Sequence, residues 1–237
     1  MKKYIGTKQI EAEPMTMGEA DKNCLIAVGE RLSKEEQSIE GYHTKYDDGY
    51  ESWSPKDVFE KAYKIAETPV DRMQIEAEEV NGRYVKLAAF IDSGKMDEVV
   101  NNMYNKCLLE MQCCTMFDYI RLLDTRIQRM QGSDGAKVRK MNFGMAIMAL
   151  KAGYPIRRSG WNGKGLMVFK QVPAHIESDI IPKMQSLPQL AKDLILKGKG
   201  FIDYTSQCLI YNENTGRADS WVPSISDVFA DDWEIVQ

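Results

Sequence analysis

Two stripes of apolar residues at helical spacing constrain the fold of this 237-residue chain more than any other feature. The first stripe advances in steps of three and four residues: Val70, Met73, Ala77, Val80, Tyr84, Leu87 and Ile91. The second comprises Val100, Met103, Cys107, Met111, Cys114 and Phe117, followed by Ile120, Leu123, Ile127 and Met130. This spacing predicts two amphipathic helices, with a break at Asp92-Ser93-Gly94. Because two helices cannot bury both stripes alone, the hairpin must pack on a neighbour or self-associate.

The segments on either side of this hairpin divide the chain into parts. We predict an α+β protein with a small α/β unit over 1–66, the helical hairpin over 69–132, a flexible linker over 133–140 and a C-terminal domain over 141–237. In the first unit we expect a strand over 4–12 that ends at Glu13-Pro14, a strand and turn over 41–49, and a helix with Ser54 as its N-cap.

The C-terminal domain is predicted to be a small antiparallel sheet with short helices. Its clearest signal is Asn162-Gly163, which suits a type I′ turn between strands at 154–159 and 166–171. The other expected elements are helices at 143–151, 183–197 (interrupted at Pro188) and 226–230, and strands at 201–211, at Trp221 and at 233–236, with Trp233 in the core.

Composition excludes several classes of protein. The net charge of −4 disfavours binding to a nucleic-acid polymer, because such binding needs a basic surface that displaces counterions. No apolar run is long enough for a membrane helix, and the N-terminus lacks the apolar core of a signal peptide. The five cysteines include no CxxC pair. We therefore expect a cytoplasmic protein, without membrane association, in which Cys107 and Cys114 are buried small hydrophobes.

Two tryptophan-containing segments carry the candidate binding chemistry. In the first, residues 160–165, Trp161 can stack on a purine for about 1–3 kcal/mol. Asn162 can bond to a base edge or a ribose, and Arg158 and Lys164 can clamp a pyrophosphate between them. The structural alternative places Trp161 in the core, Asn162 in a turn and both charges in solvent.

The second segment runs from Trp221 to Asp227. Ser224 and Asp227 have the spacing of a helix capping box, and Trp221 and Ser226 lie beside them. A carboxylate at a helix N-terminus competes with phosphate for that position. If this segment binds a ligand, we expect Asp227 to accept hydrogen bonds from ribose hydroxyls. The structural alternative is the capping box alone.

Catalytic and metal chemistry have little support in the sequence. The two histidines, His43 and His175, lie in different predicted units, and no cluster has metal-ligand spacing. Asp231 and Asp232 are adjacent, so their side chains diverge. The chain has no P-loop, G-x-G-x-x-G or G-x-S-x-G motif. We expect no catalytic residues, no metal and no cofactor.

Four motifs carry a resemblance to a known family: Met141-Asn142-Phe143-Gly144, Arg158-x-Gly160-Trp161-Asn162-Gly163-Lys164, Trp221-x-Pro223-Ser224 and Asp231-Asp232-Trp233. In these motifs residues 141–237 resemble the phage Thoeris anti-defence type-two family, and residues 1–140 lie outside the resemblance. The resemblance implies homo-oligomers, reported as tetramers, that hold cyclic ADP-ribose isomers at protomer interfaces. Some members also accept cyclic di- or oligonucleotides.

The resemblance therefore leads us to expect a phage protein that sequesters a cyclic nucleotide immune signal without cleaving it, in the cytoplasm of an infected bacterium. The contacts expected from it are Arg158, Trp161, Asn162, Lys164, Trp221, Ser224, Ser226 and Asp227. Two alternatives stay open: a phage structural or interaction module with no small-molecule ligand, and a nucleotide-signal-degrading enzyme.

Overall fold

The computed structural model describes residues 9–27 and 31–236. The chain divides into two compact units, Met1–Glu76 and Ala77–Gln237. Both helices and antiparallel sheets are present, which confirms the α+β class. Throughout the described part of the chain, no helix combines the length and the apolarity needed to cross a bilayer.

The first unit is built on a three-stranded antiparallel sheet in the order β1-β2-β3. Its elements are β1 (Glu11–Thr16), α1 (Met17–Lys22), α2 (Lys34–Gln37), β2 (Glu40–Lys45), β3 (Glu51–Pro55) and α3 (Lys56–Ala62). Residues 4–8 of the predicted first strand lie outside the described residues.

Two predictions for this unit were wrong. The first strand does not end at Glu13-Pro14, because β1 continues through Pro14, which pairs with Tyr42. As β1 is an edge strand, a proline without an N–H is tolerated there. Ser54 does not cap the helix, because it pairs with Tyr42 inside β3, and Pro55 occupies the N-cap of α3.

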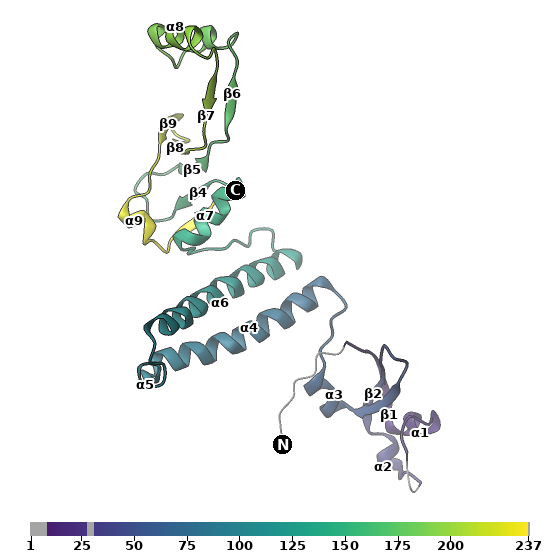
Figure 1. Ribbon diagram of the computed structural model, residues 1–237. Coiled ribbons are helices and arrows are strands. Elements are labelled where there is room, and N and C mark those ends of the chain that lie inside the picture. The colour runs from purple at the N-terminus through teal and green to yellow at the C-terminus, as the bar shows by residue number, and fades with distance from the viewer. Residues whose placement is uncertain (1–8, 28–30, 237) are drawn as a thin grey trace. The chain divides into compact units, whose positions relative to one another are not determined.

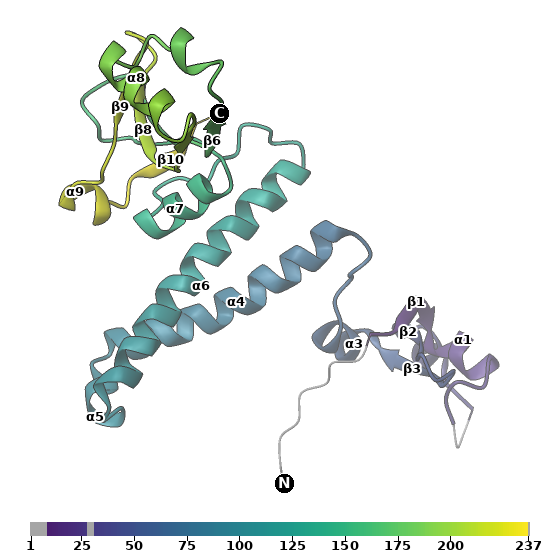
Figure 2. The same ribbon diagram turned by 45° about the horizontal axis from the view of Figure 1, so that its top comes forward.

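The predicted helical hairpin is formed by α4 (Pro69–Asp92) and α6 (Met103–Met130), which lie side by side and are joined through the short helix α5 (Lys95–Val99) (Figures 1 and 2). Gly94, at φ +72°, turns the chain out of α4. The α4 stripe is confirmed: Met73 and Ala77 are buried and its other members are partly buried.

The first half of the α6 stripe was wrong. Met103 and Met111 are 77% and 60% exposed, and Cys107 and Cys114 are exposed rather than buried. The covered face of α6 instead follows Leu109, Cys113, Met116, Ile120, Leu123 and Ile127. In its first half α6 is apolar on two faces, so periodicity alone does not identify the face that packs on α4.

The C-terminal part holds a five-stranded antiparallel sheet in the order β10-β4-β5-β8-β9. Its elements are α7 (Phe143–Lys151), β4 (Ile156–Arg158), β5 (Leu166–Lys170), β6 (Ala174–Ile176), η1 (Ile181–Lys183), α8 (Gln189–Lys197), β7 (Ile202–Tyr204), β8 (Cys208–Asn212), β9 (Arg217–Ser220), α9 (Ile225–Val228) and β10 (Trp233–Ile235). A separate β6–β7 ribbon leads away from the sheet to α8 (Figure 1).

The core of this part lies between α7 and the sheet. Trp233 and Ile156 are 0% exposed and pack with the buried face of α7, which includes Met145 and Ala146. Trp233 is therefore in the core, as predicted. The segment 131–142 is attached to the same core near its end, since Met141 exchanges two backbone hydrogen bonds with Trp233, at 3.0 and 3.1 Å.

Three local predictions in this part were wrong. Neither Asn162 nor Gly163 has a positive φ, so they do not form a type I′ turn, and the left-handed glycine of this loop is Gly165, at φ +78°. The expected strand over 201–211 is two strands, β7 and β8, in different sheets. The strand expected at Trp221 is β9, and Trp221 itself follows its end.

Candidate functional site

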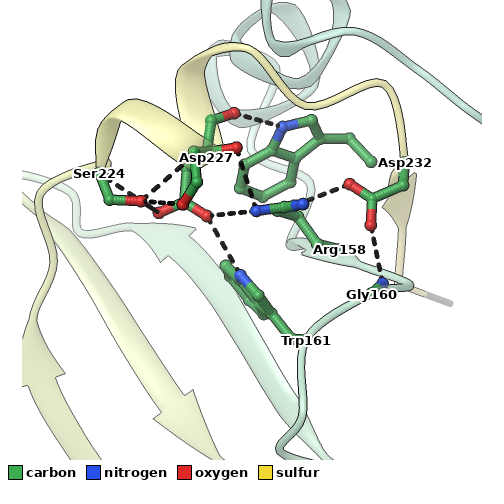
Figure 3. Close-up of polar contacts among 8 residues, drawn as sticks. Arg158, Gly160, Trp161, Ser224, Asp227 and Asp232 are labelled. Atoms are coloured by element: carbon green, nitrogen blue, oxygen red, sulfur yellow. Dashed lines mark hydrogen bonds and ion pairs between the residues drawn. The ribbon is translucent and has the colours of Figure 1, made fainter.

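The two tryptophan segments meet around one guanidinium, that of Arg158 at the end of β4 (Figure 3). Its Nε donates to Asp232 Oδ1 at 2.7 Å, and its Nη1 donates to Asp227 Oδ1 at 3.0 Å and to the Ser226 carbonyl at 3.1 Å. The Arg158 side chain is 19% exposed. It therefore ties α9 and the start of β10 to β4, and its charge is shared by two carboxylates.

The carboxylate of Asp227 has both oxygens engaged. Oδ1 accepts from Arg158 and from Trp161 Nε1, the latter at 3.2 Å, and Oδ2 accepts from the Ser224 N–H and hydroxyl at 3.0 and 2.8 Å. Burial opposes ionisation of this group, but the bonds from Ser224, Arg158 and Trp161 hold the pKa of Asp227 below its ordinary value. The Ser224–Asp227 capping box predicted from the sequence is confirmed.

Asp232 is the member of this network that sequence reasoning missed as a site residue. Its Oδ1 accepts from Arg158, and its Oδ2 accepts the Gly160 N–H at 2.8 Å. Burial would raise the pKa of Asp232, but these bonds keep it below the ordinary value. A Cβ on Gly160 would lie 2.6 Å from Oδ2, so glycine permits this close approach.

The indoles of Trp161 and Trp221 both meet buried Trp233 edge to face. The ring centroids are 5.4 Å apart for Trp161 and 6.1 Å for Trp221, with interplanar angles of 78° and 80°. Both rings are partly buried against the core. Both tryptophans therefore pack at the margin of the core, as the structural alternative expected for Trp161, but part of each ring stays exposed.

The structure does not bring all the predicted contacts into this network. Asn162 and Lys164 are exposed on the loop between β4 and β5. The Lys164 carbonyl accepts from Asn214 Nδ2 at 2.6 Å, whereas its ammonium forms no ion pair with a described residue. Ser226 contributes its hydroxyl, 2.8 Å from that of Ser224, and its carbonyl, which accepts from Arg158. Of the eight predicted contacts, five lie in the network: Arg158, Trp161, Ser224, Ser226 and Asp227. Trp221 packs on Trp233 instead, and the side chains of Asn162 and Lys164 lie exposed at the edge of the network.

The C-terminal domain that holds this network is similar to known proteins. Residues 141–236 match the family model of the Thoeris anti-defense 2-like domain. Thoeris anti-defense 2 of Bacillus phage SP01 is 35% identical over 102 residues, which cover 41% of this chain and 96% of that protein. The chain belongs to the Thoeris anti-defense 2 family. The resemblance inferred from the sequence motifs is confirmed.

The match to the Thoeris anti-defense 2-like domain spans the sheet domain and the residues of the Arg158 network, and it begins at residue 141. Residues 67–129 match a second family model, named Sequestin. This match covers α4 and almost all of α6. The helical hairpin thus matches a different family model from the one that residues 141–236 match.

Proposed function

We propose that this chain is a phage anti-defence protein that binds a cyclic nucleotide immune signal and sequesters it without cleavage. The observation that carries the proposal is family membership, with a relative covered over 96% of its length. The signal is proposed to be a cyclic ADP-ribose isomer, or a cyclic di- or oligonucleotide. Sequestration acts by mass action, so it requires tight binding and protein in excess of the signal.

The geometry supports two roles among the predicted contacts: some residues position their neighbours, and others contact the ligand. Arg158 and Asp227 form an ion pair inside the fold. We therefore propose that they position Trp161 and do not contact the ligand themselves. The bond from Trp161 Nε1 to Asp227 limits rotation of the indole, and a fixed aromatic surface binds a base at a lower entropic cost. Trp161 is therefore proposed to stack on the base, with Asn162 and Lys164 contacting the ribose and phosphates.

The second tryptophan segment is proposed to face another protomer. Val222, Ile225 and Phe229 are each at least 80% exposed and lie within or beside α9. A group of exposed large apolar side chains marks an interaction surface. We propose that a second copy covers this group, so that Trp221, Ser224 and Ser226 lie near ligand held between protomers of a homo-oligomer, a tetramer by resemblance. The proposed site of action is the cytoplasm of the infected bacterium.

One observation favours the interaction-module alternative for another part of the chain. The outer face of α6 exposes Met103, Tyr104 and Met111 by 60% or more. Such a face suits a macromolecular partner better than a small ligand. Under this alternative the chain would respond to no nucleotide.

Titration of the purified chain with cyclic ADP-ribose isomers distinguishes these alternatives. We expect saturable quenching of tryptophan fluorescence, because a base stacked on Trp161 changes the surroundings of its indole. Linear ADP-ribose is the matched control, and we expect it to quench at least tenfold more weakly. Absence of any response to cyclic ADP-ribose isomers, cyclic dinucleotides and cyclic oligonucleotides would contradict the proposal and favour the interaction module.

A further inference from the structure

A cavity of about 420 Å³ lies beside the Arg158 network, where residues 135–140 (the basic arm) pass β4 and β10. Four cations, Lys137, Arg139, Lys140 and Arg157, and two carboxylates, Asp232 and Glu234, contribute to its lining. Small-molecule sites typically occupy about 300–1,000 Å³. The cavity is therefore large enough for a mononucleotide.

The carboxylates of this cavity are already paired with arginines. Glu234 Oε1 accepts from Arg157 Nε at 2.6 Å, and Asp232 is held by Arg158 and Gly160. By contrast, Lys137, Arg139 and Lys140 make no ion pair or side-chain hydrogen bond with any described residue. The lining therefore carries a surplus of positive charge in a chain whose net charge is −4.

The basic arm is held in place although it contains no helix or strand. Arg129 Nη1 donates to the carbonyls of Asp134 and Ala136, at 2.6 and 3.0 Å. Val138 packs against the core of the C-terminal domain. The side chains on either side of Val138 are thus presented from a backbone that is fixed at both ends, by α6 and by the core.

The backbone of Lys140 adopts an uncommon conformation. Its φ is +55°, in the left-handed region that lysine rarely adopts. Non-glycine residues held in this region are concentrated at functional sites, where the surrounding structure maintains the unfavourable conformation. Here the conformation leads directly into the Met141–Trp233 backbone pair.

We propose that this cavity binds the pyrophosphate group of a nucleoside diphosphate. Arginine binds two phosphate oxygens at once, so Arg139 can hold one phosphate, while Lys137 and Lys140 supply point charges for the other. The site is separate from the surface at Trp161. It depends on residues 137–140, which precede the matched domain at 141–236.

Calorimetric titration of the full chain with ADP and with inorganic pyrophosphate tests the proposal. We expect the wild-type chain to bind ADP saturably, with one ligand for each chain. The triple variant K137Q/R139Q/K140Q should bind ADP at least tenfold more weakly. Since these side chains form no ion pair or hydrogen bond with any described residue, its circular dichroism should be unchanged. The matched control K183Q/K197Q/K199Q removes three exposed lysines away from the cavity, and its affinity should stay within twofold of wild type.

The result separates this site from the proposed signal-binding surface. Trp161→Ala should leave ADP affinity within twofold, and K137Q/R139Q/K140Q should retain fluorescence quenching by the cyclic signal. Binding of pyrophosphate without ADP, binding of neither, or an equal loss in both triple variants would overturn the proposal. Loss of ADP binding in Trp161→Ala, with normal binding in K137Q/R139Q/K140Q, would also overturn it.

Discussion

Arg158→Met is expected to lower the free energy of unfolding of the C-terminal part by roughly 3–5 kcal/mol, the usual cost of removing one partner from a buried ion pair. The substitution keeps much of the side-chain volume but leaves Asp227 and Asp232, whose side chains are 10% and 28% exposed, without their cation. Urea unfolding at pH 7, followed by tryptophan fluorescence, measures this difference.

The matched control is the neighbouring Arg157→Met. Arg157 is 43% exposed and pairs with Glu234, so its loss should cost less than about 1 kcal/mol. The account of the network would be contradicted if the two substitutions cost the same.

The pH dependence of the Arg158→Met effect follows from the two carboxylates. Their pKa values lie below the ordinary 3.8 in the folded protein. A carboxylate whose pKa is lower in the folded than in the unfolded protein stabilises the fold at pH values above its unfolded pKa of 3.8. That stabilisation is lost as the pH falls through the pKa of the folded state. The difference between wild type and Arg158→Met should therefore shrink as the pH falls below 3.8. A difference that is constant with pH would contradict the electrostatic origin.

Trp161→Ala is expected to weaken binding of the cyclic nucleotide by about five- to 150-fold, which corresponds to roughly 1–3 kcal/mol for one aromatic–base stack. Trp161→Phe keeps an aromatic face but loses the Nε1–H bond to Asp227, so its affinity should lie between those of wild type and alanine. Calorimetry gives the affinities, and near-ultraviolet circular dichroism checks that Trp233 remains packed. Equal affinity for alanine and wild type would place the ligand elsewhere.

Local patterns in the sequence predicted the parts of this fold that depend on neighbouring residues. The Ser224–Asp227 capping box spans one helical turn, and the α4 stripe repeats along one helix, so both could be read directly from spacing. The role of Arg158 could not be read in this way. Its partner Asp232 is 74 residues away, and the two meet because β4 pairs with β10. Arg158 therefore resembled a free phosphate ligand in the sequence, although its charge is satisfied within the fold.

The exposed face of α6 shows a second limit of sequence patterns. Met103, Met111 and Phe117 repeat as regularly as a buried stripe does, because hydrophobic periodicity records that a face is apolar and not what covers it.

The loop at Asn162-Gly163 shows a third limit. Its residues suit a tight turn, but β4 and β5 pair through only Ile156 and Val168, so seven residues, 159–165, span the gap between the strands.

Under the proposed function the chain holds its signal intact. Purified protein is incubated with a cyclic ADP-ribose isomer and freed of unbound ligand. It is then denatured by heat, and the released material is identified by mass spectrometry. We expect the bound cyclic nucleotide to be recovered unchanged, in an amount proportional to the protein. Recovery of a linear or otherwise cleaved product would contradict sequestration without cleavage.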